Sequence, residues 1–372
     1  MKAIGIILAG GNNNRMKELT AKRAVPALPV AGSFRSIDFA LSSMSNSHIQ
    51  TVAVLTQYNA RSLNEHLSSS KWWNFGRKQG GLFLFTPTVT ADNSDWYRGT
   101  ADAMYQNIDF LKRRHEPYVI ISSGDCVYKL DFNRVLDFHI EKKSDITVVC
   151  KDMMYNDDVS RFGVVRMDDE SRITEFDEKP IEALSNTIST GIYVIRRRQL
   201  IELLEAAAEE NRFDFVNDIL VRYKNVKKIY GYKINSYWNN IADIDAYFKT
   251  NMDFLRPDVR SYFFREEPTI CSKVDDLPPA KFNPGSDISN SLVSSGCIIN
   301  GRVEDSVLFK QVFVGKNTTV KNCVLLNDVY IGDNVHLENC IVESRGTINP
   351  NTCYCGEDGV MIVKEKNVRY VI

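Results

Sequence analysis

The sequence predicts a doubly wound, Rossmann-like α/β domain followed by a C-terminal left-handed parallel β-helix. Over the first part of the chain, short apolar runs alternate with amphipathic segments, as in a parallel sheet covered by helices. In the last part, an aliphatic residue recurs about every six positions, which is typical of a β-helix. A segment rich in Pro, Ser and charge separates the two patterns. We expect an α/β domain over residues 1–255, a linker over 256–290 and a β-helix over 291–372.

The composition allows a large apolar core and gives no reason to expect nucleic acid or a membrane as a partner. Of 372 residues, 44% are hydrophobic, and 46 basic residues nearly balance 47 acidic ones, for a net charge of -1. Met1 leads directly into the first apolar run, and no apolar run approaches ~20 residues, so we expect a soluble protein without a signal peptide. The eight cysteines form no Cys-x-x-Cys pair, which favours reduced thiols in the cytoplasm. Cys353-Tyr354-Cys355 alone supplies too few ligands for a metal.

Buried strands and amphipathic helices are expected to alternate through the α/β domain. Each expected strand is a short run rich in β-branched or other aliphatic residues, and each expected helix carries apolar residues on one side. The strands are expected at residues 3–8, 51–55, 118–121 and 145–149, and the helices at residues 36–47, 101–114 and 198–210. Ligands of a doubly wound sheet bind beyond the carboxyl ends of its strands, so residues that directly follow a strand are site candidates.

The first expected strand ends at Gly10-Gly11 and continues into a polar, basic segment that contains Arg15. Glycines at this point let backbone N–H groups approach an anion closely, and phosphate is the usual anion. The same glycines are equally compatible with an ordinary strand-to-loop turn, because short glycine motifs are common.

Two further strand ends carry polar residues. Gln57 follows the second expected strand, and Asp125 follows the third. A carboxylate there is placed to hold Mg²⁺ between a nucleotide and a sugar phosphate, because this hard cation prefers carboxylate and phosphate oxygens. Thr100 is placed to cap the helix expected over 101–114, and taken alone Gly99-Thr100 is no more than a helix start.

The C-terminal repeat predicts a prism filled by aliphatic side chains. Its residues recur every six positions, with slips of one position after Leu326 and after Leu337, and they are Val314, Val320, Leu326, Ile331, Leu337, Val342 and Ile348. Such coils serve in stacking and assembly, or they carry acyltransferase sites. His336 stands alone in this part of the sequence, which argues against an acyltransferase.

Leu8-Ala9-Gly10-Gly11, Arg15 and the segment Lys22-Arg23-Ala24-Val25-Pro26 together resemble the signature of the sugar-1-phosphate nucleotidyltransferases. The similarity is strongest to the ADP-glucose pyrophosphorylases of bacterial glycogen synthesis, and it extends over nearly the whole chain. These enzymes make ADP-glucose from ATP and glucose 1-phosphate by in-line attack of the sugar phosphate on the α-phosphorus. The resemblance implies the same nucleotidyltransferase domain and β-helix here.

The resemblance also implies roles for particular residues. It implies catalytic roles for Arg15 and Asp125, nucleotide binding by Leu8, Gly10, Gly11, Gln57, Tyr97, Gly99 and Thr100, sugar-phosphate binding by Glu178, Lys179, Ser189 and Gly191, and effector binding by Lys22, Arg23 and Arg35. The three effector residues are implied to converge near the cleft between the domains, where some members of the family bind sugar bisphosphates or phosphoglycerate. Otherwise Lys22 and Arg23 are solvated surface charges.

The sequence departs from the family pattern at the groups that contact phosphate or metal. Asn13 replaces the third glycine of the loop, so a side chain occupies space that the triphosphate needs. Val25 replaces a phosphate-binding lysine, and Cys126 replaces the histidine of the family's Gly-Asp-His motif. Asn240 replaces the second metal carboxylate, so the site keeps Asp125 but loses a negative charge and a strong ligand.

This pattern of losses is similar to that of the glycogen-biosynthesis proteins of the GlgD type. The resemblance implies a non-catalytic regulatory subunit in a heterotetramer with a catalytic glucose-1-phosphate adenylyltransferase subunit. It implies no cofactor for this chain and Mg²⁺ for its partner. The alternative is a catalytically active adenylyltransferase. Losing one preorganised charge contact typically costs ~10²- to 10³-fold in rate, so three losses favour the regulatory subunit.

Overall fold

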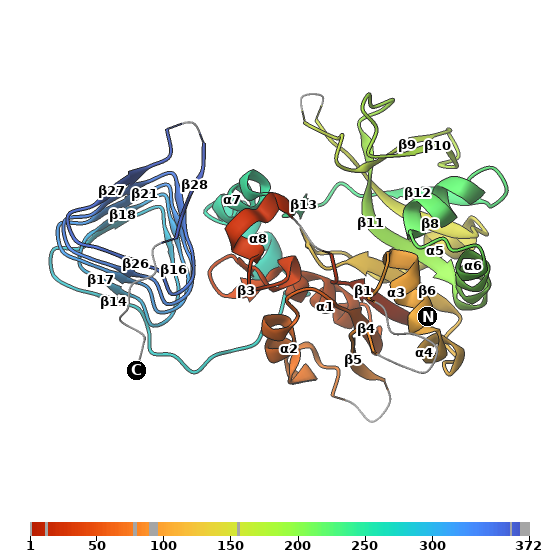
Figure 1. The fold of residues 1–372 in the computed structure, drawn as a ribbon, viewed down its shortest axis with the longest axis horizontal. Coiled ribbons are helices and arrows are strands. Elements are labelled where there is room, and N and C mark those ends of the chain that lie inside the picture. The colour runs from red at the N-terminus through yellow and green to blue at the C-terminus, as the bar shows by residue number, and fades with distance from the viewer. Residues whose placement is uncertain are drawn as a thin grey trace.

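The computed structural model describes residues 2–11, 14–76, 80–88, 96–154, 157–357 and 359–364. Within these ranges, an α/β domain is followed by a triangular β-helix that stands beside it (Figure 1). The helices of the described ranges are all too short or too polar to cross a membrane.

A mixed nine-stranded sheet forms the centre of the α/β domain. Its strands are β1 (Ala3–Leu8), β4 (Thr51–Leu55), β5 (Gly81–Phe85), β6 (Tyr118–Ser123), β8 (Ile146–Asp152), β9 (Gly163–Met167), β10 (Ile173–Glu178), β11 (Thr187–Arg196) and β12 (Ile229–Lys233). β6, β1, β4 and β5 lie side by side and parallel, which is the doubly wound part that the sequence predicts. β11 runs antiparallel to β6, β8 and β9 and extends the sheet beyond the parallel part.

Helices cover both faces of this sheet, which lies between two apolar clusters. These helices are α1 (Ser36–Asn46), α2 (Arg61–Leu67), α3 (Thr100–Gln106), α4 (Ile108–Lys112), α5 (Phe132–Glu141) and α6 (Arg197–Glu209). The domain also contains α7 (Ile244–Asp253) and α8 (Pro257–Phe264), which pack in a third apolar cluster, and the helical segments η1 (Asn14–Thr20), η2 (Val25–Ala27), η3 (Ser70–Trp73) and η4 (Val216–Val221). The single helix expected over 101–114 is two helices, because Asn107 leaves the helical conformation and donates its side-chain amide to the Ala103 carbonyl.

The sequence predicts that Thr100 caps α3, but Thr100 is not the N-cap residue. Gly99 occupies the N-cap position, and Thr100 is the first residue of the helix. The Thr100 hydroxyl instead accepts a hydrogen bond from the Phe215 N–H at 2.8 Å. The side chain therefore ties the start of α3 to the segment before η4, a contact between distant parts of the sequence.

The segment between the domains is shorter than the expected linker over 256–290. Pro257 begins α8, which fits the preference for proline in the first turn of a helix. The first strands of the β-helix, β14 (Lys281–Phe282) and β15 (Asp287–Ser289), already lie within the expected linker. Extended chain without strand or helix therefore covers mainly residues 265–280.

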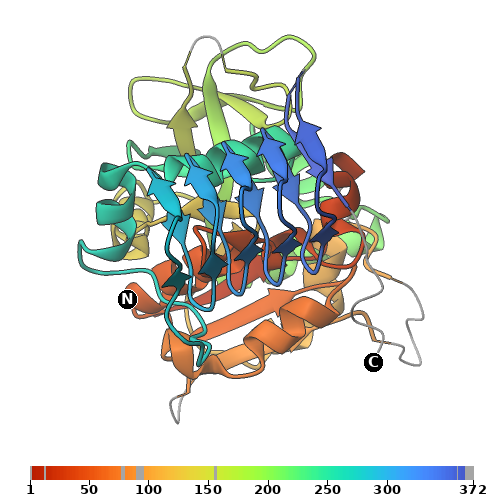
Figure 2. The ribbon, with the colours of Figure 1, turned by 90° about the vertical axis from the view of Figure 1, so that its left-hand side faces the viewer.

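The β-helix consists of three five-stranded parallel sheets. One contains β14, β17 (Ile298–Ile299), β20 (Phe313–Val314), β23 (Tyr330–Ile331) and β26 (Thr347–Ile348), the next β15, β18 (Arg302–Glu304), β21 (Thr319–Lys321), β24 (His336–Glu338) and β27 (Cys353–Cys355), and the third β16 (Leu292–Val293), β19 (Val307–Leu308), β22 (Val324–Leu325), β25 (Cys340–Val342) and β28 (Met361–Val363). Figure 2 shows the coils stacked in register. Gly315 permits this stacking, because a Cβ there would lie 2.5 Å from the Gly332 backbone of the next coil.

One residue of the predicted repeat, Leu326, does not fill the prism. Val314, Val320, Ile331, Leu337, Val342 and Ile348 are all buried inside the prism, as predicted. Leu325, however, fills the prism in place of Leu326. The first slip of one position therefore lies between Val320 and Leu325 rather than after Leu326. Leu326 is buried in a different cluster, shared with the α/β domain. Because neighbouring residues of this sheet are buried on opposite faces, both Leu325 and Leu326 are apolar, and the sequence alone does not show which of them points into the prism.

The two domains share an apolar interface, because the third sheet of the β-helix is buried on both faces. Leu308, Leu325 and Val342 point into the prism. Their neighbours Val307, Val324 and Ile341 pack with residues of η1, α7 and α8. In Figure 1 this sheet, which carries β16 and β28, is the one that faces α7 and α8.

Candidate functional site

A cleft of about 470 Å³ opens at the carboxyl ends of β1, β4 and β6. This is where a doubly wound sheet places its ligand. The wall contains all seven residues predicted to bind nucleotide, together with Val25 and Asp125, and these seven are Leu8, Gly10, Gly11, Gln57, Tyr97, Gly99 and Thr100. The structure therefore brings together residues from five separate segments of the chain.

The two glycines of the first loop leave the floor of the cleft open. A Cβ added at Gly11 would meet no atom within 4 Å, and one at Gly10 would make only an ordinary contact of 3.4 Å with Gln57. Protein packing therefore does not require glycine at either position. The space that a side chain would fill is free for a ligand that approaches the backbone. Asn13 and its neighbour Asn12 lie outside the described residues.

Gln57 fixes the opposite wall of the cleft. Its side-chain amide donates to the Tyr97 carbonyl at 3.3 Å and accepts from the Tyr97 N–H at 2.6 Å. The Tyr97 ring is buried, its hydroxyl accepts from Asn107, and burial raises the pKa of this tyrosine. Gln57 is therefore already paired with protein backbone, and its main role here is to hold the segment that contains Tyr97.

Gly99 is required by the fold itself. A Cβ at this position would lie 2.3 Å from the Phe213 carbonyl oxygen, which accepts hydrogen bonds from the first N–H groups of α3. The close packing of these segments therefore accounts for Gly99 without any ligand.

Sequence reasoning did not single out the aromatic pair at the edge of the cleft. The rings of Tyr58 and Trp96 are stacked with centroids 5.8 Å apart, and their residues are 40% and 61% exposed. Such exposed, parallel rings suit contact with a planar base. The available signal was position, since each aromatic residue is adjacent to a predicted binding residue.

Asp125 lies at the inner end of the cleft and is engaged by its neighbours. Its Oδ1 atom accepts from the Ser123 hydroxyl at 2.5 Å and from the Cys126 thiol at 3.4 Å. Cys126 belongs to β7 (Cys126–Tyr128), which pairs with β13 (Trp238–Asn240) so that Cys126 stands opposite Asn240. Complete burial raises the pKa of the Cys126 thiol well above its usual range, so this thiol stays neutral at neutral pH.

Asn240 lies close to Asp125, since the N–H of the next residue, Ile241, donates to the Asp125 carbonyl, and both ends of the Asn240 amide are paired. Its oxygen accepts from the Ala242 N–H at 3.0 Å, and its nitrogen faces the Cys126 sulfur at 3.5 Å. The position that would supply a second carboxylate is therefore a neutral amide held by the protein.

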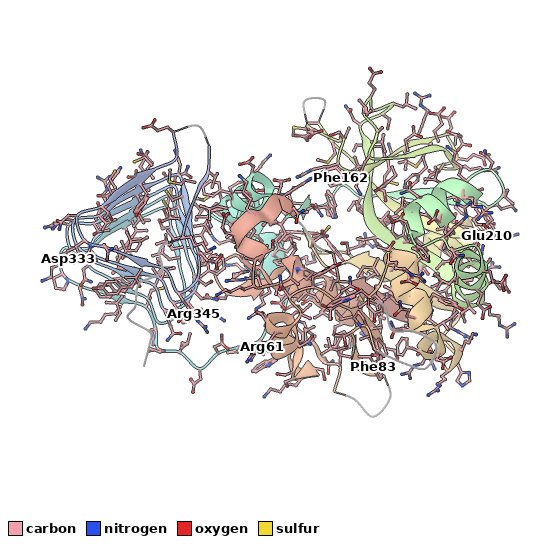
Figure 3. All side chains as sticks on the ribbon, in the orientation of Figure 1. Arg61, Phe83, Phe162, Glu210, Asp333 and Arg345 are labelled. Atoms are coloured by element: carbon pink, nitrogen blue, oxygen red, sulfur yellow. The ribbon has the colours of Figure 1, made fainter. Side chains whose placement is uncertain are left out.

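The cation Arg161 lies close enough to Asp125 for the two charges to interact. Arg161 forms an ion pair with Asp243, whose other oxygen caps α7 through the Ala246 N–H at 2.7 Å. Burial lowers the pKa of Arg161, and the negative charges of Asp158 and Asp125 oppose this effect. Phe162, labelled in Figure 3, packs edge-on against Trp238 of β13 and so fixes the segment that carries Arg161.

These groups do not make a good site for Mg²⁺. This ion prefers carboxylate oxygens in octahedral geometry. Asp125 offers one carboxylate, Asn240 offers an amide that is already paired, and the nearby carboxylate of Asp243 is paired with Arg161. The donor set therefore supplies too little negative charge to bind the ion firmly.

The predicted sugar-phosphate residues lie on β11, which is next to the strand that leads to Asp125, and at the end of β10, two strands further away. Gly191 has a positive φ of 75°, and a Cβ there would lie 3.4 Å from that of Ser123. Ser189 is buried and donates to the Tyr193 hydroxyl at 3.3 Å. Glu178 and Lys179 form an ion pair at 3.0 Å in which the lysine side chain is 60% exposed. An incoming phosphate can therefore reach Lys179 from solvent.

The three predicted effector residues have different surroundings. Lys22 is exposed, and Arg23 pairs with Glu343 and Ser344 of the β-helix. Arg35 donates to the Ser62 carbonyl at 2.7 Å, and its burial lowers its pKa.

Arg35 alone of these three lines a small pocket between the domains. The pocket has a volume of about 140 Å³, and its wall also contains Lys273 and Lys310. These two lysines were not predicted, because they come from the segment between the domains and from the β-helix. Asp275 pairs with Lys310 at 2.7 Å and so offsets part of the positive charge.

Comparison with known protein families gives a match in each domain. Residues 4–256 match the family described as nucleotidyl transferase. Residues 278–362 match the family described as GlmU-like, C-terminal hexapeptide.

Curated proteins named glucose-1-phosphate adenylyltransferase are similar over most of the chain. The protein of Geobacillus stearothermophilus is 39% identical over 365 residues, which cover 97% of this chain and 94% of the relative. The protein of Clostridium novyi (strain NT) is 38% identical over 85% of this chain and 84% of the relative. The protein of Bacillus subtilis (strain 168) is 36% identical over 86% of this chain and 84% of the relative.

Proposed function

Because the chain belongs to the glucose-1-phosphate adenylyltransferase family of nucleotidyl transferases, we propose that it acts there as a non-catalytic regulatory subunit. In this role it pairs with a catalytic subunit in a heterotetramer and modulates the synthesis of ADP-glucose for glycogen. The chain itself needs no cofactor, and Mg²⁺ serves the catalytic partner.

The observation that carries the proposal is the pairing of Asn240 beside Asp125. Adenylyl transfer depends mainly on positioning and on charge stabilisation, so the carboxylates that hold the metal are central to it. Here the second of these positions is an amide whose two ends are committed to Ala242 and Cys126. Nearby, the carboxylate of Asp243 is paired with Arg161 and so is not free to hold a metal.

Val25 supports the same conclusion at the other side of the cleft. It lines the cleft but is only 4% exposed, and its side chain belongs to the apolar cluster shared with the β-helix. A lysine ammonium at this position would face phosphate, whereas the valine stabilises the contact between the domains. We infer that this position serves the interface rather than catalysis.

The alternative is an active glucose-1-phosphate adenylyltransferase. The open cleft of about 470 Å³ and the presence of Asp125 in its wall favour it. This alternative requires the chain to transfer an adenylyl group with one carboxylate at the metal site. The expected loss of at least ~10⁴-fold in rate argues against it.

The proposal is tested by assembly and activity together. A tagged form of the chain is recovered from its native cells, and mass spectrometry identifies the proteins that accompany it. We expect a catalytic adenylyltransferase subunit in stoichiometric amount, and a mixed complex whose substrate affinity or maximal rate differs from that of the catalytic subunit alone. A chain that is recovered alone and makes ADP-glucose at an ordinary enzymatic rate would establish the alternative.

A further inference from the structure

Four metal-binding side chains meet on one outer face of the β-helix. β24 and β27 run parallel as neighbours, and their register places His336 opposite Cys353 and Glu338 opposite Cys355. Residues two apart in a strand point to the same face of a sheet. Leu337, between His336 and Glu338, points into the prism, so the flanking side chains point outward.

Three of the four donor atoms lie close to one another, and the fourth, the Cys353 sulfur, lies next to the Cys355 sulfur. The ligand atoms of His336, Glu338 and Cys355 all lie within 4.8 Å of one another. His336 Nε2 is 3.6 Å from Glu338 Oε2, and the Sγ atoms of Cys353 and Cys355 are 3.6 Å apart. Around a tetrahedral Zn²⁺ the distance between donors is about 3.4 Å for a nitrogen–oxygen pair and about 3.8 Å for two sulfurs.

We propose that His336, Glu338, Cys353 and Cys355 form a binding site for Zn²⁺. Zn²⁺ is borderline soft and accepts the mixture of thiolate, imidazole and carboxylate that these residues offer. A hard cation such as Mg²⁺ or Ca²⁺ would find only one carboxylate among the four. In the described part of the chain, no other three ligands of this kind gather so closely.

Lys321 orients the carboxylate of this site. Its ammonium lies 3.1 Å from Glu338 Oε1, whereas His336 faces the other oxygen, Oε2. The lysine and the metal therefore do not compete for one oxygen atom. An outer partner of this kind fixes a metal ligand in place and is typical of built metal sites.

The proposed ion would join the last two strands of its sheet. β24 and β27 belong to successive coils, and among the described residues β27 is the last strand of its sheet. A repeat protein needs protection at its last repeat. A metal bridging the two coils would hold the terminal coil in register. This sheet is not the one that contacts the α/β domain, so the site is independent of the nucleotide cleft.

The experiment uses the full chain, reduced and freed of metal. Zn²⁺ binding is measured by competition with a chromophoric chelator, and Co²⁺ replaces Zn²⁺ for absorption spectroscopy. We expect one tightly bound ion per chain, with a sulfur-to-cobalt charge-transfer band and the strong visible bands of tetrahedral Co²⁺. Zn²⁺ should also raise the melting temperature of the chain.

Matched variants assign the ion to the site. Cys355→Ser and His336→Gln should each weaken Zn²⁺ binding at least ~100-fold, because loss of an outer partner alone typically costs 10- to 100-fold. Cys271→Ser is the control, because this exposed thiol lies in the segment between the domains, outside the β-helix. Cys271 contacts Ser42 and Trp73 through its backbone N–H and carbonyl, which the substitution keeps. It should leave Zn²⁺ binding unchanged.

Two results would overturn the proposal. One is a wild-type chain that fails to bind Zn²⁺ under reducing conditions. The other is binding that survives both Cys355→Ser and His336→Gln, because the ion would then be held elsewhere. Circular dichroism checks that each variant retains the fold. We expect it to do so, because the substituted side chains point outward from the prism.

Discussion

The guanidinium of Arg23, in the α/β domain, pairs with the carboxylate of Glu343, in the β-helix. Arg23 also donates to the Ser344 hydroxyl at 3.2 Å, and both partners of the ion pair are largely shielded from solvent. Burial raises the pKa of Glu343, although the neighbouring Arg23 opposes this effect. The pair thus joins the two domains at the edge of their apolar interface, next to a segment predicted to bind an effector.

We predict that charge-neutral replacement of Lys22 and Arg23 by glutamine alters the effector response or the substrate affinity of the mixed complex. An effector shifts an equilibrium only if it binds one arrangement of the complex more tightly than the other, and a phosphate would do so through charge-assisted hydrogen bonds. The measurement compares ADP-glucose synthesis with and without sugar bisphosphate or phosphoglycerate. The catalytic subunit's own activity should stay unchanged.

Glu343→Gln separates binding from coupling, because it weakens the ion pair and leaves both cations in place. An altered effector response in the Lys22 and Arg23 variant alone would indicate effector binding by the cations. The same change in both variants would indicate coupling through the domain interface. Identical behaviour of the mixed complex with and without the cations would show that their role is structural. Lys227→Gln with Lys228→Gln serves as the control for lost surface charge.

We predict that the chain alone makes ADP-glucose at least ~10⁴-fold more slowly than a typical enzyme rate of ~10 s⁻¹. Asn13→Gly, Val25→Lys and Asn240→Asp together should raise this rate more than any single change, because the three groups act on one cluster of charge. Product formation is measured on the purified chain. A wild-type rate within about tenfold of ~10 s⁻¹ would contradict the prediction.

Val25→Lys needs its own control, because Val25 is only 4% exposed and packs in the cluster between the domains. The lysine stem can remain in the apolar contact while the ammonium reaches the cleft. The melting temperature of each variant shows whether a missing gain in activity reflects lost folding.

Glucose 1-phosphate is predicted to stabilise the chain through Glu178 and Lys179. A ligand at ~100 times its Kd adds about 2.7 kcal/mol to the free energy of unfolding, which a thermal shift assay detects. Lys179→Ala should remove this shift, and because alanine keeps a Cβ, the strain at its positive φ of 50° is unchanged. Lys316→Ala, at an exposed position of the β-helix, should keep the shift. An unchanged melting temperature of the wild-type chain in millimolar ligand would argue against a sugar-phosphate pocket.

His139 is predicted to make the α/β domain sensitive to acid. Burial lowers its pKa to about 4, its Nδ1 atom lies 2.8 Å from the Thr147 hydroxyl, and its Nε2 atom is buried without a hydrogen-bond partner among the described residues. Its unfolded-state pKa is about 6.5, so the unfolded chain binds this proton first as the pH falls. The stability is therefore complete above pH ~6.5 and decreases toward pH ~4.

The expected loss from this group is about 2 kcal/mol between pH 7.5 and pH 5, measured by urea unfolding. His139→Asn, which keeps a polar atom within reach of Thr147, should show a correspondingly smaller loss. His115→Asn is the control, because His115 is exposed. Equal pH dependence in the wild-type chain and the His139 variant would contradict the prediction.

The sequence alone determined the fold class and most of the wall of the cleft at the carboxyl ends of β1, β4 and β6. The strand that ends at Leu8 and the motifs that contain Gln57, Gly99 and Asp125 were recognisable because each follows a short apolar run or opens a helix. Parallel strands then bring these ends together whatever the details of packing. The six-residue repeat likewise predicted the β-helix, since its period is a property of the chain.

Tertiary structure decided what local sequence could not encode. Leu326 looks like a prism residue, yet the third sheet is buried on both faces, and only the contact with the α/β domain reveals that Leu325 fills the prism. Thr100 looks like a helix cap, but its hydroxyl bonds to Phe215 instead.

The same distinction applies to the sites. Cys353 and Cys355 are too few for a metal until the pitch of the coil places His336 and Glu338 beside them, one coil earlier in the chain. Arg23 and Arg35 are close in sequence, but Arg23 pairs with Glu343 of the β-helix, whereas Arg35 donates to the Ser62 carbonyl within the α/β domain. Periodicity and motif spacing are local properties, whereas which of two apolar faces is covered and which charges meet depend on residues far apart along the chain.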